Sequence, residues 1–184
     1  MASYDCPWMF KGNEFESENL YKVKKNRKGV TLKDEQGNDL YELDKNIFSF
    51  IYIITDMTNN KKYIGQKMFT TQKPVTKNKK TTKKTVESDW KVYFSSSETL
   101  KQLVKEQGSS QLKREIIYIC CSKGQANYLE TKLQFELQCL EDQERWYNGI
   151  VNLRCRWNHL KLDELIDKDD DLLQALYSEY RPTF

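Results

Sequence analysis

The sequence has a single histidine, no closely spaced C-x-x-C cysteines and no long apolar run. Among 184 residues there are one histidine, His159, and five cysteines without any C-x-x-C pair. These residues are too few and too poorly spaced for a zinc site or a disulfide framework. The N-terminus MASYDCPWMF lacks the basic region and apolar core of a signal peptide, and no apolar run approaches the ~20 residues that span a bilayer. We therefore expect a reduced, cytoplasmic protein with no membrane partner.

Charge is unevenly distributed along the chain. The net charge is only +3, but lysines concentrate in residues 61–91 and acidic residues in 163–171. Residues 70–86 are low in complexity and have Val75 and Val86 as their only apolar residues. This composition predicts a basic loop that is mobile or ordered by nucleic acid. The asymmetry suggests an anionic partner, and a solvated lysine face is the simpler alternative.

Apolar patterns predict an α+β architecture for residues 46–160. β-branched and aromatic residues dominate 47–54, the turn-forming DMTNNK follows, and KKYIGQKMF resumes the strand. LKREIIYICC predicts a third strand. Apolar residues three and four apart predict helices over 97–107, ending at Gly108, and from Ser122 onward in SKGQANYLETKLQFELQCL. The order β-β-α-β-α indicates layers of sheet and helix.

Segments at either end extend this domain. In residues 1–45, an irregular aromatic-rich segment precedes a hairpin predicted by GVTLKDEQGNDLYEL, which alternates on both sides of QGND. In residues 161–184, an acidic amphipathic helix is predicted. Its apolar side could pack on its own domain, which is the interpretation we favour, form a homodimer or bind another protein.

Glu130, Tyr52 and Tyr63 are candidate functional residues. Glu130 lies at the edge of the apolar stripe of its predicted helix, where a carboxylate is costly unless it is paired, hydrated or bound to a metal. The two tyrosines occupy corresponding positions in the predicted hairpin, where packing is their usual role. Gly65 follows at a point where the backbone must approach another group closely.

The stretch FIYIITDMTNNKKYIG resembles the signature of the GIY-YIG nucleases. Phe50-Ile51-Tyr52 and Tyr63-Ile64-Gly65 match its two tripeptides, Glu130 in NYLETK matches its glutamate, and Asn148 in WYNGI matches its asparagine.

Further stretches are similar to phage-encoded members that are described as homing-type endonucleases. They are the N-terminal PW and FKG residues, ESDWKVYFSSSETL, LKREIIYIC, SKGQANYLE and WYNGIV. The resemblance covers about residues 1–16 and 46–160, and it leaves out the hairpin insert and the acidic tail.

The resemblance implies a small three-stranded antiparallel sheet flanked by helices, and a metal-dependent endonuclease acting on double-stranded DNA in the host cytoplasm. Glu130 would hold one Mg²⁺ or Mn²⁺ ion against the phosphodiester. Tyr63 would orient or deprotonate water, Tyr52 would fix Tyr63, and Asn148 would be a support residue.

The GIY-YIG pattern usually has an arginine in a helix soon after the second tripeptide, and this sequence departs from the pattern there. No arginine occurs between Arg27 and Arg114. Lys67 is the nearest substitute, although a lysine is a less directional cation. The alternatives are a catalytically inactive relative that binds DNA or a protein, and an unrelated nucleic-acid binder.

Several residues are expected to contact the DNA. Trp90, Tyr93 and Phe94 could stack on bases, but closing the core is the favoured interpretation. Lys83, Lys84 and Lys91 are alternatives to Lys67 as the cation of the site. The residues expected to contact DNA phosphates, or to let the backbone approach the DNA, are Gly65, Lys73, Lys77, Lys79, Lys80, Lys83, Lys84, Lys91, Arg154 and Arg156.

Overall fold

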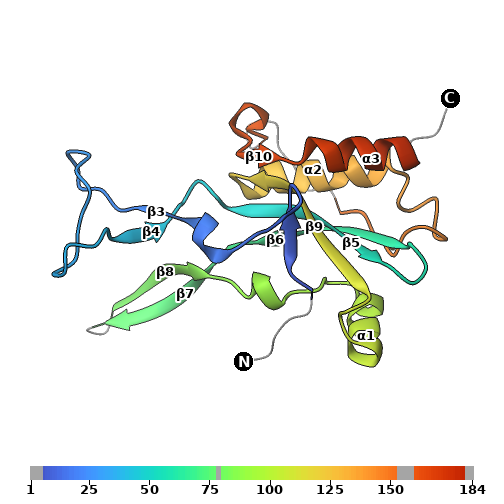
Figure 1. Cartoon of the computed structure of the whole chain (residues 1–184), viewed down its shortest axis with the longest axis horizontal. Coiled ribbons are helices and arrows are strands. Elements are labelled where there is room, and N and C mark those ends of the chain that lie inside the picture. Colours follow the sequence, from blue (N-terminus) through green and yellow to red (C-terminus); the bar gives the residue numbers. More distant parts are fainter. Residues whose placement is uncertain (1–5, 78–79, 153–159, 181–184) are drawn as a thin grey trace.

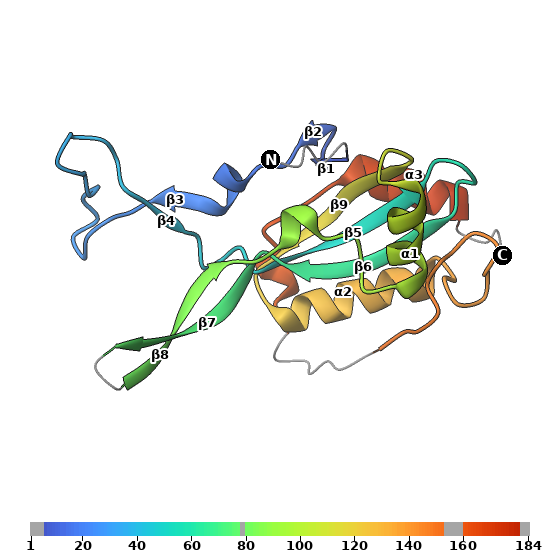
Figure 2. The ribbon, with the colours of Figure 1, turned by 90° about the horizontal axis from the view of Figure 1, so that it is seen from below.

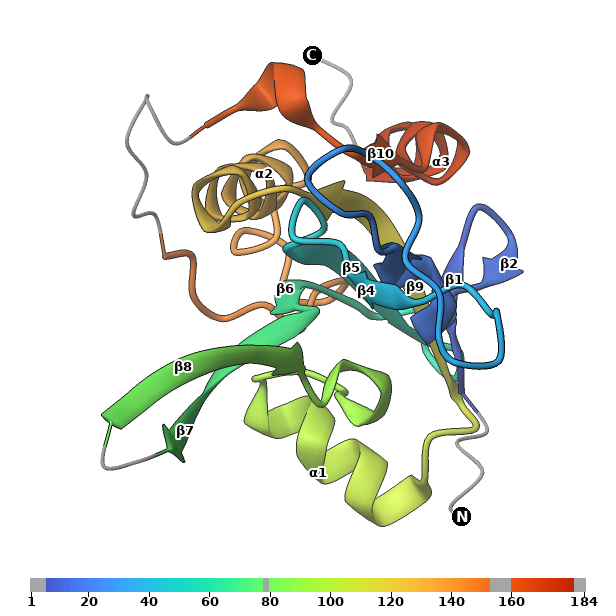
Figure 3. The same cartoon turned by 90° about the vertical axis from the view of Figure 1, so that its left-hand side faces the viewer.

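The computed structural model describes residues 6–77, 80–152 and 160–180. A mixed sheet lies between two layers of helices, with α2 and α3 on one face and α1 on the other (Figures 1 and 3). Its strand order is β2-β1-β9-β5-β6, and β10 also pairs with β9. Within the described residues no helix has the length and apolarity to cross a membrane.

Three antiparallel strands at the centre come from the three predicted β runs. They are β5 (Ser49–Asp56), β6 (Lys62–Met68) and β9 (Leu112–Cys120), with β5 in the middle. Every residue of β5 is buried, because both of its faces are covered. β6 lies at the edge of the sheet, so its far side is available to other segments.

The sheet is larger than the predicted three-stranded one. β1 (Trp8–Phe10) pairs in parallel with one half of β9, and β10 (Asp167–Lys168) pairs antiparallel with the other half. β2 (Asn13–Glu14) returns beside β1. These short segments satisfy the outer backbone groups of β9, which would otherwise form an exposed edge. The N-terminal segment is therefore partly regular, followed by a 3₁₀ turn, η1 (Ser17–Leu20).

The two faces of the sheet have different cores. Isoleucines of β5 and β6 pack with leucines of α2 and α3 on one face. On the opposite face the side chains are mostly aromatic, including Trp8, Phe50, Tyr52, Phe69 and Trp90. Residue alternation along β5 sends Ile51 and Ile53 to the first face and Phe50 and Tyr52 to the second.

The two predicted internal helices are present. α1 (Glu98–Gln107) ends at Gly108, whose φ of 79° is readily adopted by glycine. α2 (Lys123–Glu136) begins after Ser122, whose side chain accepts a hydrogen bond from the backbone N–H of Gln125 at 3.1 Å.

The acidic tail is helical only in its second half. α3 spans Asp170–Tyr180, and a 3₁₀ turn, η4 (Leu162–Glu164), and β10 precede it. Asp169 caps α3 by accepting from the N–H of Leu172 at 3.0 Å, and its other oxygen accepts from the N–H of Lys11. Leu173 and Leu176 are buried in the aliphatic core. The apolar side of α3 therefore packs on its own domain, as favoured.

Two antiparallel arms extend from the same end of the sheet (Figures 1 and 2). The first joins β3 (Tyr21–Val23) to β4 (Tyr41–Leu43). The second, here called the ribbon, joins β7 (Thr70–Lys77) to β8 (Lys80–Glu87). The ribbon replaces the predicted mobile loop, because threonines and valines among the lysines favour extended backbone.

Candidate active site

A pocket of about 920 Å³ lies beside the edge strand β6. Its walls come from β6, the start of α1 with the segment before it, the helix α2 and the segment after Trp146. They contribute Tyr63, Gln66, Ser96, Ser97, Glu98, Thr99, Asn127, Glu130, Gln134, Tyr147, Gly149, Ile150 and Asn152. The pocket thus places hydroxyl, amide and carboxylate groups around one open volume.

Tyr63 brings a phenol to this pocket, and Tyr52 lies behind it. The hydroxyl of Tyr63 is 3.2 Å from that of Ser96. Tyr52 is completely buried, with its ring 6.2 Å from that of Tyr63 and 5.1 Å from that of Trp8. Burial, followed by the phenols of Tyr93 and Tyr63, raises the pKa of Tyr52 well above its ordinary value. Tyr52 is therefore a neutral packing group at neutral pH and not a pocket-lining base.

The close approach expected at Gly65 is to the tyrosine rings. A Cβ atom at this position would lie 2.5 Å from the Tyr52 hydroxyl oxygen and 2.8 Å from a ring carbon of Tyr63. No side chain fits there without displacing both rings. Gly65 is also absent from the pocket walls, so the structure gives it a packing role and does not place it against substrate.

Glu130 reaches the pocket from the second turn of α2. Its Oε2 accepts a hydrogen bond from the amide of Gln66 at 2.7 Å, and that amide also donates to Asn127 at 2.8 Å. Burial raises the pKa of Glu130 to about 7, although the hydrogen bonds from Gln66 oppose this rise. The carboxylate is thus held in place, but its hydrogen bonds only partly offset the cost of burying its charge.

Asn148 supports β6, the strand that carries Tyr63. Its side-chain Oδ1 accepts from the N–H of Ile64 at 2.9 Å, and its Nδ2 donates to the carbonyl of Ile64 at 2.7 Å. The amide therefore binds the edge of β6 as a neighbouring strand would. Asn148 is only 2% exposed, and both of these hydrogen bonds join it to the backbone of β6.

Lys67 lies outside the pocket walls. Its ammonium binds Asp89 at 2.6 Å and lies 3.9 Å from the centre of the Tyr93 ring. A second lysine, Lys101 in the first turns of α1, was not among the sequence candidates. Its pKa is raised, first by a hydrogen bond to Glu98 and also by the phenols of Tyr93 and Tyr63. The helical position of Lys101 after the second tripeptide was the signal that could have identified it.

Arg114 is a second residue that the sequence analysis missed. It is 1% exposed in β9 and donates to the carbonyls of Lys91, Tyr93 and Cys6. Its guanidinium lies against the ring of Trp8, at 4.6 Å from the centroid. Arg114 thereby fixes the segment that leads to Ser96, and its alternation with the buried Ile116 was the signal for an inward-facing arginine.

The pocket suits a divalent cation that needs few protein ligands. Within the described residues, no cluster of three histidine, cysteine or acidic side chains could hold a metal ion. Glu130 is nevertheless a half-buried carboxylate beside the neutral amides Asn127, Gln134 and Asn152. Mg²⁺ commonly takes one or two carboxylates and completes its shell with water and phosphate oxygens. Glu130 therefore fits such an ion.

The expected DNA contacts divide into three groups. Lys73, Lys83 and Lys84 are exposed on the ribbon, and Lys91 is exposed in the 3₁₀ turn η2 (Trp90–Val92). Lys77 and Lys80 are placed by their backbone alone, at opposed positions of β7 and β8. The remaining candidates lie outside the described residues, namely Lys79, Arg154, Arg156 and the neighbouring His159.

The aromatic residues before α1 pack into the molecule. Trp90 is 1% exposed, and Tyr93 and Phe94 pack against the same aromatic core. The favoured interpretation that these rings close the core is confirmed, and they offer no exposed stacking platform.

A family model described as "Putative endonuclease segE, GIY-YIG domain" matches residues 34–151. This span is more than half of the chain and contains both strand tyrosines, the pocket glutamate and Asn148. The chain belongs to the GIY-YIG family. GIY-YIG proteins form a nuclease family, so this relation makes a nucleic acid the substrate class. No curated protein and no solved structure matches the chain.

The GIY-YIG match also separates the common domain from its additions. It includes β4, β5, β6, the ribbon, α1, β9 and α2, and it excludes β1, β2, β3, β10 and α3. Of these excluded elements, β1 and β10 pair with β9 and α3 packs against it, whereas β2 pairs with β1 and β3 pairs with β4 in the separate arm. In this GIY-YIG protein β1, β2 and β10 extend the sheet, and none of the excluded elements lines the pocket in the described part of the chain.

Proposed function

We propose that the protein is a metal-dependent endonuclease of phage origin that hydrolyses phosphodiester bonds in double-stranded DNA with one divalent ion. The observation that carries this proposal is the shared pocket of Tyr63 and Glu130. Its volume of about 920 Å³ accommodates a nucleotide linkage. Both side chains come from positions that match the family signature.

Glu130 would hold Mg²⁺ or Mn²⁺, and the bound ion would supply Lewis-acid stabilisation of the phosphate and of the leaving oxygen. The hydrogen bond from Gln66 fixes the orientation of the carboxylate. Because Glu130 is only partly compensated, a cation beside it also restores its ionised form.

Tyr63 would orient the attacking water and assist its deprotonation. A free phenol has a pKa near 10 and is a weak base at neutral pH. Two lysines of the described chain lie near this part of the pocket. Lys101 interacts electrostatically with Tyr63, and Lys67 lies on the neighbouring Tyr93 ring. Gly65 lets the rings of Tyr52 and Tyr63 pack tightly. Asn148 holds the backbone of β6 at Ile64, next to Tyr63.

A catalytically inactive DNA- or protein-binding relative is the second candidate. The pocket walls include no lysine or arginine among the described residues, and Lys67 is already bound to Asp89. A site without a strong cation would stabilise the transition-state charge less well.

Plasmid nicking in the presence of Mg²⁺ or Mn²⁺ tests the proposal. The wild-type protein should nick the plasmid, a chelator should stop it, and Glu130→Gln should abolish nicking while leaving binding in low salt intact. Glu141→Gln is the matched control because Glu141 is exposed and lies outside the pocket. If the wild-type protein cuts no DNA with either ion, the endonuclease proposal fails and the binding alternative replaces it.

A further inference from the structure

The ribbon is an unsupported two-stranded sheet with eight residues in each strand. β7 pairs with β8 alone, from Thr70 opposite Glu87 to Lys77 opposite Lys80. The ribbon extends away from the body in every view in which both are seen (Figures 1, 2 and 3). At about 3.4 Å per residue it is about 27 Å long. Isolated two-stranded ribbons are only marginally stable in water. Packing in the rest of the domain therefore does not explain why these strands stay paired along their whole length.

The charges on the ribbon oppose its formation. Lys73 lies directly opposite Lys84, and like charges at opposed positions destabilise a strand pair. None of Lys73, Lys83 and Lys84 forms an ion pair with a carboxylate of the described chain. A polyanion on this surface would neutralise these charges and stabilise the paired strands.

The two faces of the ribbon differ in chemistry. On one face Gln72 donates to Thr85 at 2.8 Å, and the hydroxyls of Thr76 and Thr81 are 3.1 Å apart. These polar groups already satisfy one another across the strands.

The other face carries the opposed pairs Lys73–Lys84 and Val75–Thr82. Val75 is 42% exposed, and the hydroxyl of Thr82 donates a hydrogen bond to the carbonyl of Val75 at 3.3 Å. This lysine face therefore presents two ammonium groups beside exposed methyl groups.

We infer that the ribbon enters the major groove of duplex DNA with its lysine face toward the base edges. The groove, about 12 Å wide, admits a two-stranded ribbon. Lysines bind phosphates and the acceptor edge of guanine, and exposed methyl groups contact the thymine methyl. The inference rests on the proposed function for its choice of duplex DNA as the partner, and it adds a surface that selects the sequence.

The base of the ribbon is anchored to the strand that carries Tyr63. Only Phe69 separates β6 from β7, and it is completely buried against Phe15, Phe50 and Trp90. Its carbonyl accepts from the N–H of Ser88 at 2.8 Å, which joins the two strands at the base. A ribbon held in the groove therefore places the pocket at a fixed offset from the bases that it contacts.

Binding measurements without metal test the inference separately from cleavage. Fluorescence anisotropy would be recorded in the Glu130→Gln background on two duplexes of one sequence, one with thymine and one with uracil. Lys73→Ala/Lys84→Ala should weaken binding about tenfold and lower the slope of log K against log salt by about 2. Uracil should weaken binding by the unaltered ribbon several-fold, because the C5 methyl group is lost.

Two further variants localise the effect to one face. Val75→Ser/Thr82→Ser should bind both duplexes equally, since its methyl contacts are gone. Lys83→Ala, on the opposite face, should lower affinity moderately while preserving the preference for thymine. Near-ultraviolet and far-ultraviolet circular dichroism would show that each variant is folded.

Each result separates the two proposals. Equal binding of both duplexes by the unaltered ribbon would overturn groove recognition and leave only phosphate contact. Unchanged affinity and salt dependence in Lys73→Ala/Lys84→Ala would overturn the DNA-binding role of the ribbon. If the wild-type protein never nicks DNA but the ribbon variants behave as expected, the endonuclease proposal fails while the inference about the ribbon holds.

Discussion

The pocket lies beside β6, and one residue separates β6 from the first strand of the ribbon, yet the pocket and the ribbon have opposite chemistry. The pocket walls carry carboxylates, amides and hydroxyls without any lysine among the described residues, whereas the ribbon sequence holds six lysines and one acidic residue, Glu87. A pocket of this kind can hold a cation and a reacting phosphate, but it supplies little attraction for a polyanion. The ribbon supplies attraction but no group suited to hydrolysis. We infer that reaction rate and DNA affinity are controlled by separate parts of the chain.

The largest expected effect separates rate from affinity at Tyr63. Tyr63→Phe removes the phenol oxygen from the pocket and keeps the ring packed on Tyr52, so cleavage should fall by about 10²–10⁴-fold. The dissociation constant for DNA, measured without metal, should change less than about twofold. Single-turnover cleavage and anisotropy on one duplex would measure both. A parallel loss of affinity would show that the pocket and the ribbon are not independent.

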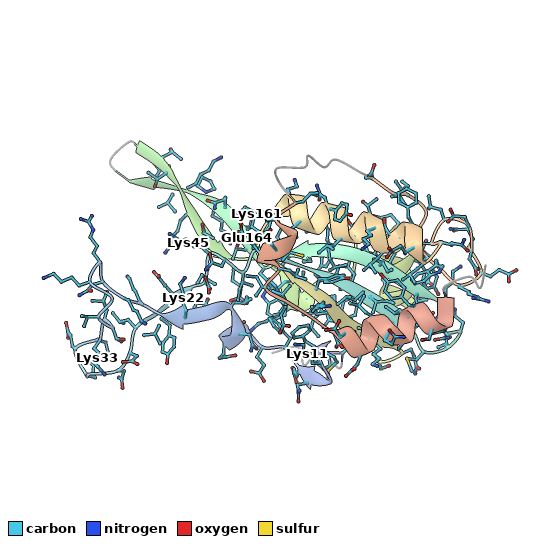
Figure 4. The ribbon with its side chains drawn as sticks, turned by 90° about the horizontal axis from the view of Figure 1, so that it is seen from above. Lys11, Lys22, Lys33, Lys45, Lys161 and Glu164 are labelled. Atoms are coloured by element: carbon cyan, nitrogen blue, oxygen red, sulfur yellow. The ribbon has the colours of Figure 1, made fainter. Side chains whose placement is uncertain are left out.

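The two arms allow a sharper comparison of charge, because acidic residues offset most of the basic residues in only one of them. In the β3–β4 arm Lys22 binds Asp44 at 2.9 Å and Lys33 binds Asp39 at 3.1 Å, and Figure 4 shows this arm with Lys22, Lys33 and Lys45 labelled. Residues 21–45 hold seven basic and five acidic residues. We therefore expect this arm to contribute little to DNA affinity.

Adjacent lysine pairs provide the matched test of this difference. Lys83→Ala/Lys84→Ala in the ribbon should weaken DNA binding about tenfold and reduce its salt dependence. Lys24→Ala/Lys25→Ala removes the same charge from the β3–β4 arm and should change affinity by less than about twofold. Titrations at several salt concentrations would compare the variants. Equal losses from both arms would mean that the net charge, and not the ribbon, determines affinity.

The next effect concerns how tightly the pocket is built. Gly65→Ala would place a Cβ atom 2.5 Å from the Tyr52 hydroxyl oxygen, in a fully buried region that cannot expand cheaply. The free energy of unfolding should fall by about 3 kcal/mol, and cleavage should fall with it. Gly149→Ala is the control because nothing lies within 4 Å of its Cβ position. Urea denaturation of both variants gives the comparison, and equal stability would contradict the packing role of Gly65.

Local patterns predicted the parts of this fold that depend on local sequence. The apolar runs around Ile51, Ile64 and Ile116 became the three central strands, and Ser122 and Gly108 mark helix boundaries where expected. Glu130 was identified because a carboxylate at the edge of an apolar stripe needs a partner. These signals act within one turn or one strand, where the side-chain pattern is decisive.

Features that depend on distant contacts were not predicted. β1 and β10 are short and acquire their strand conformation by pairing with β9, which no local pattern reveals. The ribbon has no buried face, so its alternation of lysine and threonine resembled a low-complexity loop. Lys101 was missed because its proximity to Tyr63 depends on how α1 packs on the aromatic face of the sheet.

The smallest expected effect is a pH dependence that belongs to the pocket and not to the ribbon. Burial raises the pKa of Glu130 from 4.5 to about 7 in the metal-free protein, so the fold favours its protonated form. The resulting stability is fully present below pH 4.5 and is lost as the pH rises through 7. Wild-type protein should lose about 1–2 kcal/mol of unfolding free energy across this range, allowing for partial exposure to solvent.

Glu130→Gln should lack this component, because its side chain does not titrate, whereas the ribbon variant Lys83→Ala/Lys84→Ala should retain it. Urea denaturation at pH 5 and pH 8 would measure the difference. Saturating Mg²⁺ should recover stability at pH 8 in the wild type and in the ribbon variant but not in Glu130→Gln, since the ion favours the ionised carboxylate. The same pH dependence in Glu130→Gln would place the titrating group elsewhere and would remove the electrostatic reason for a cation in the pocket.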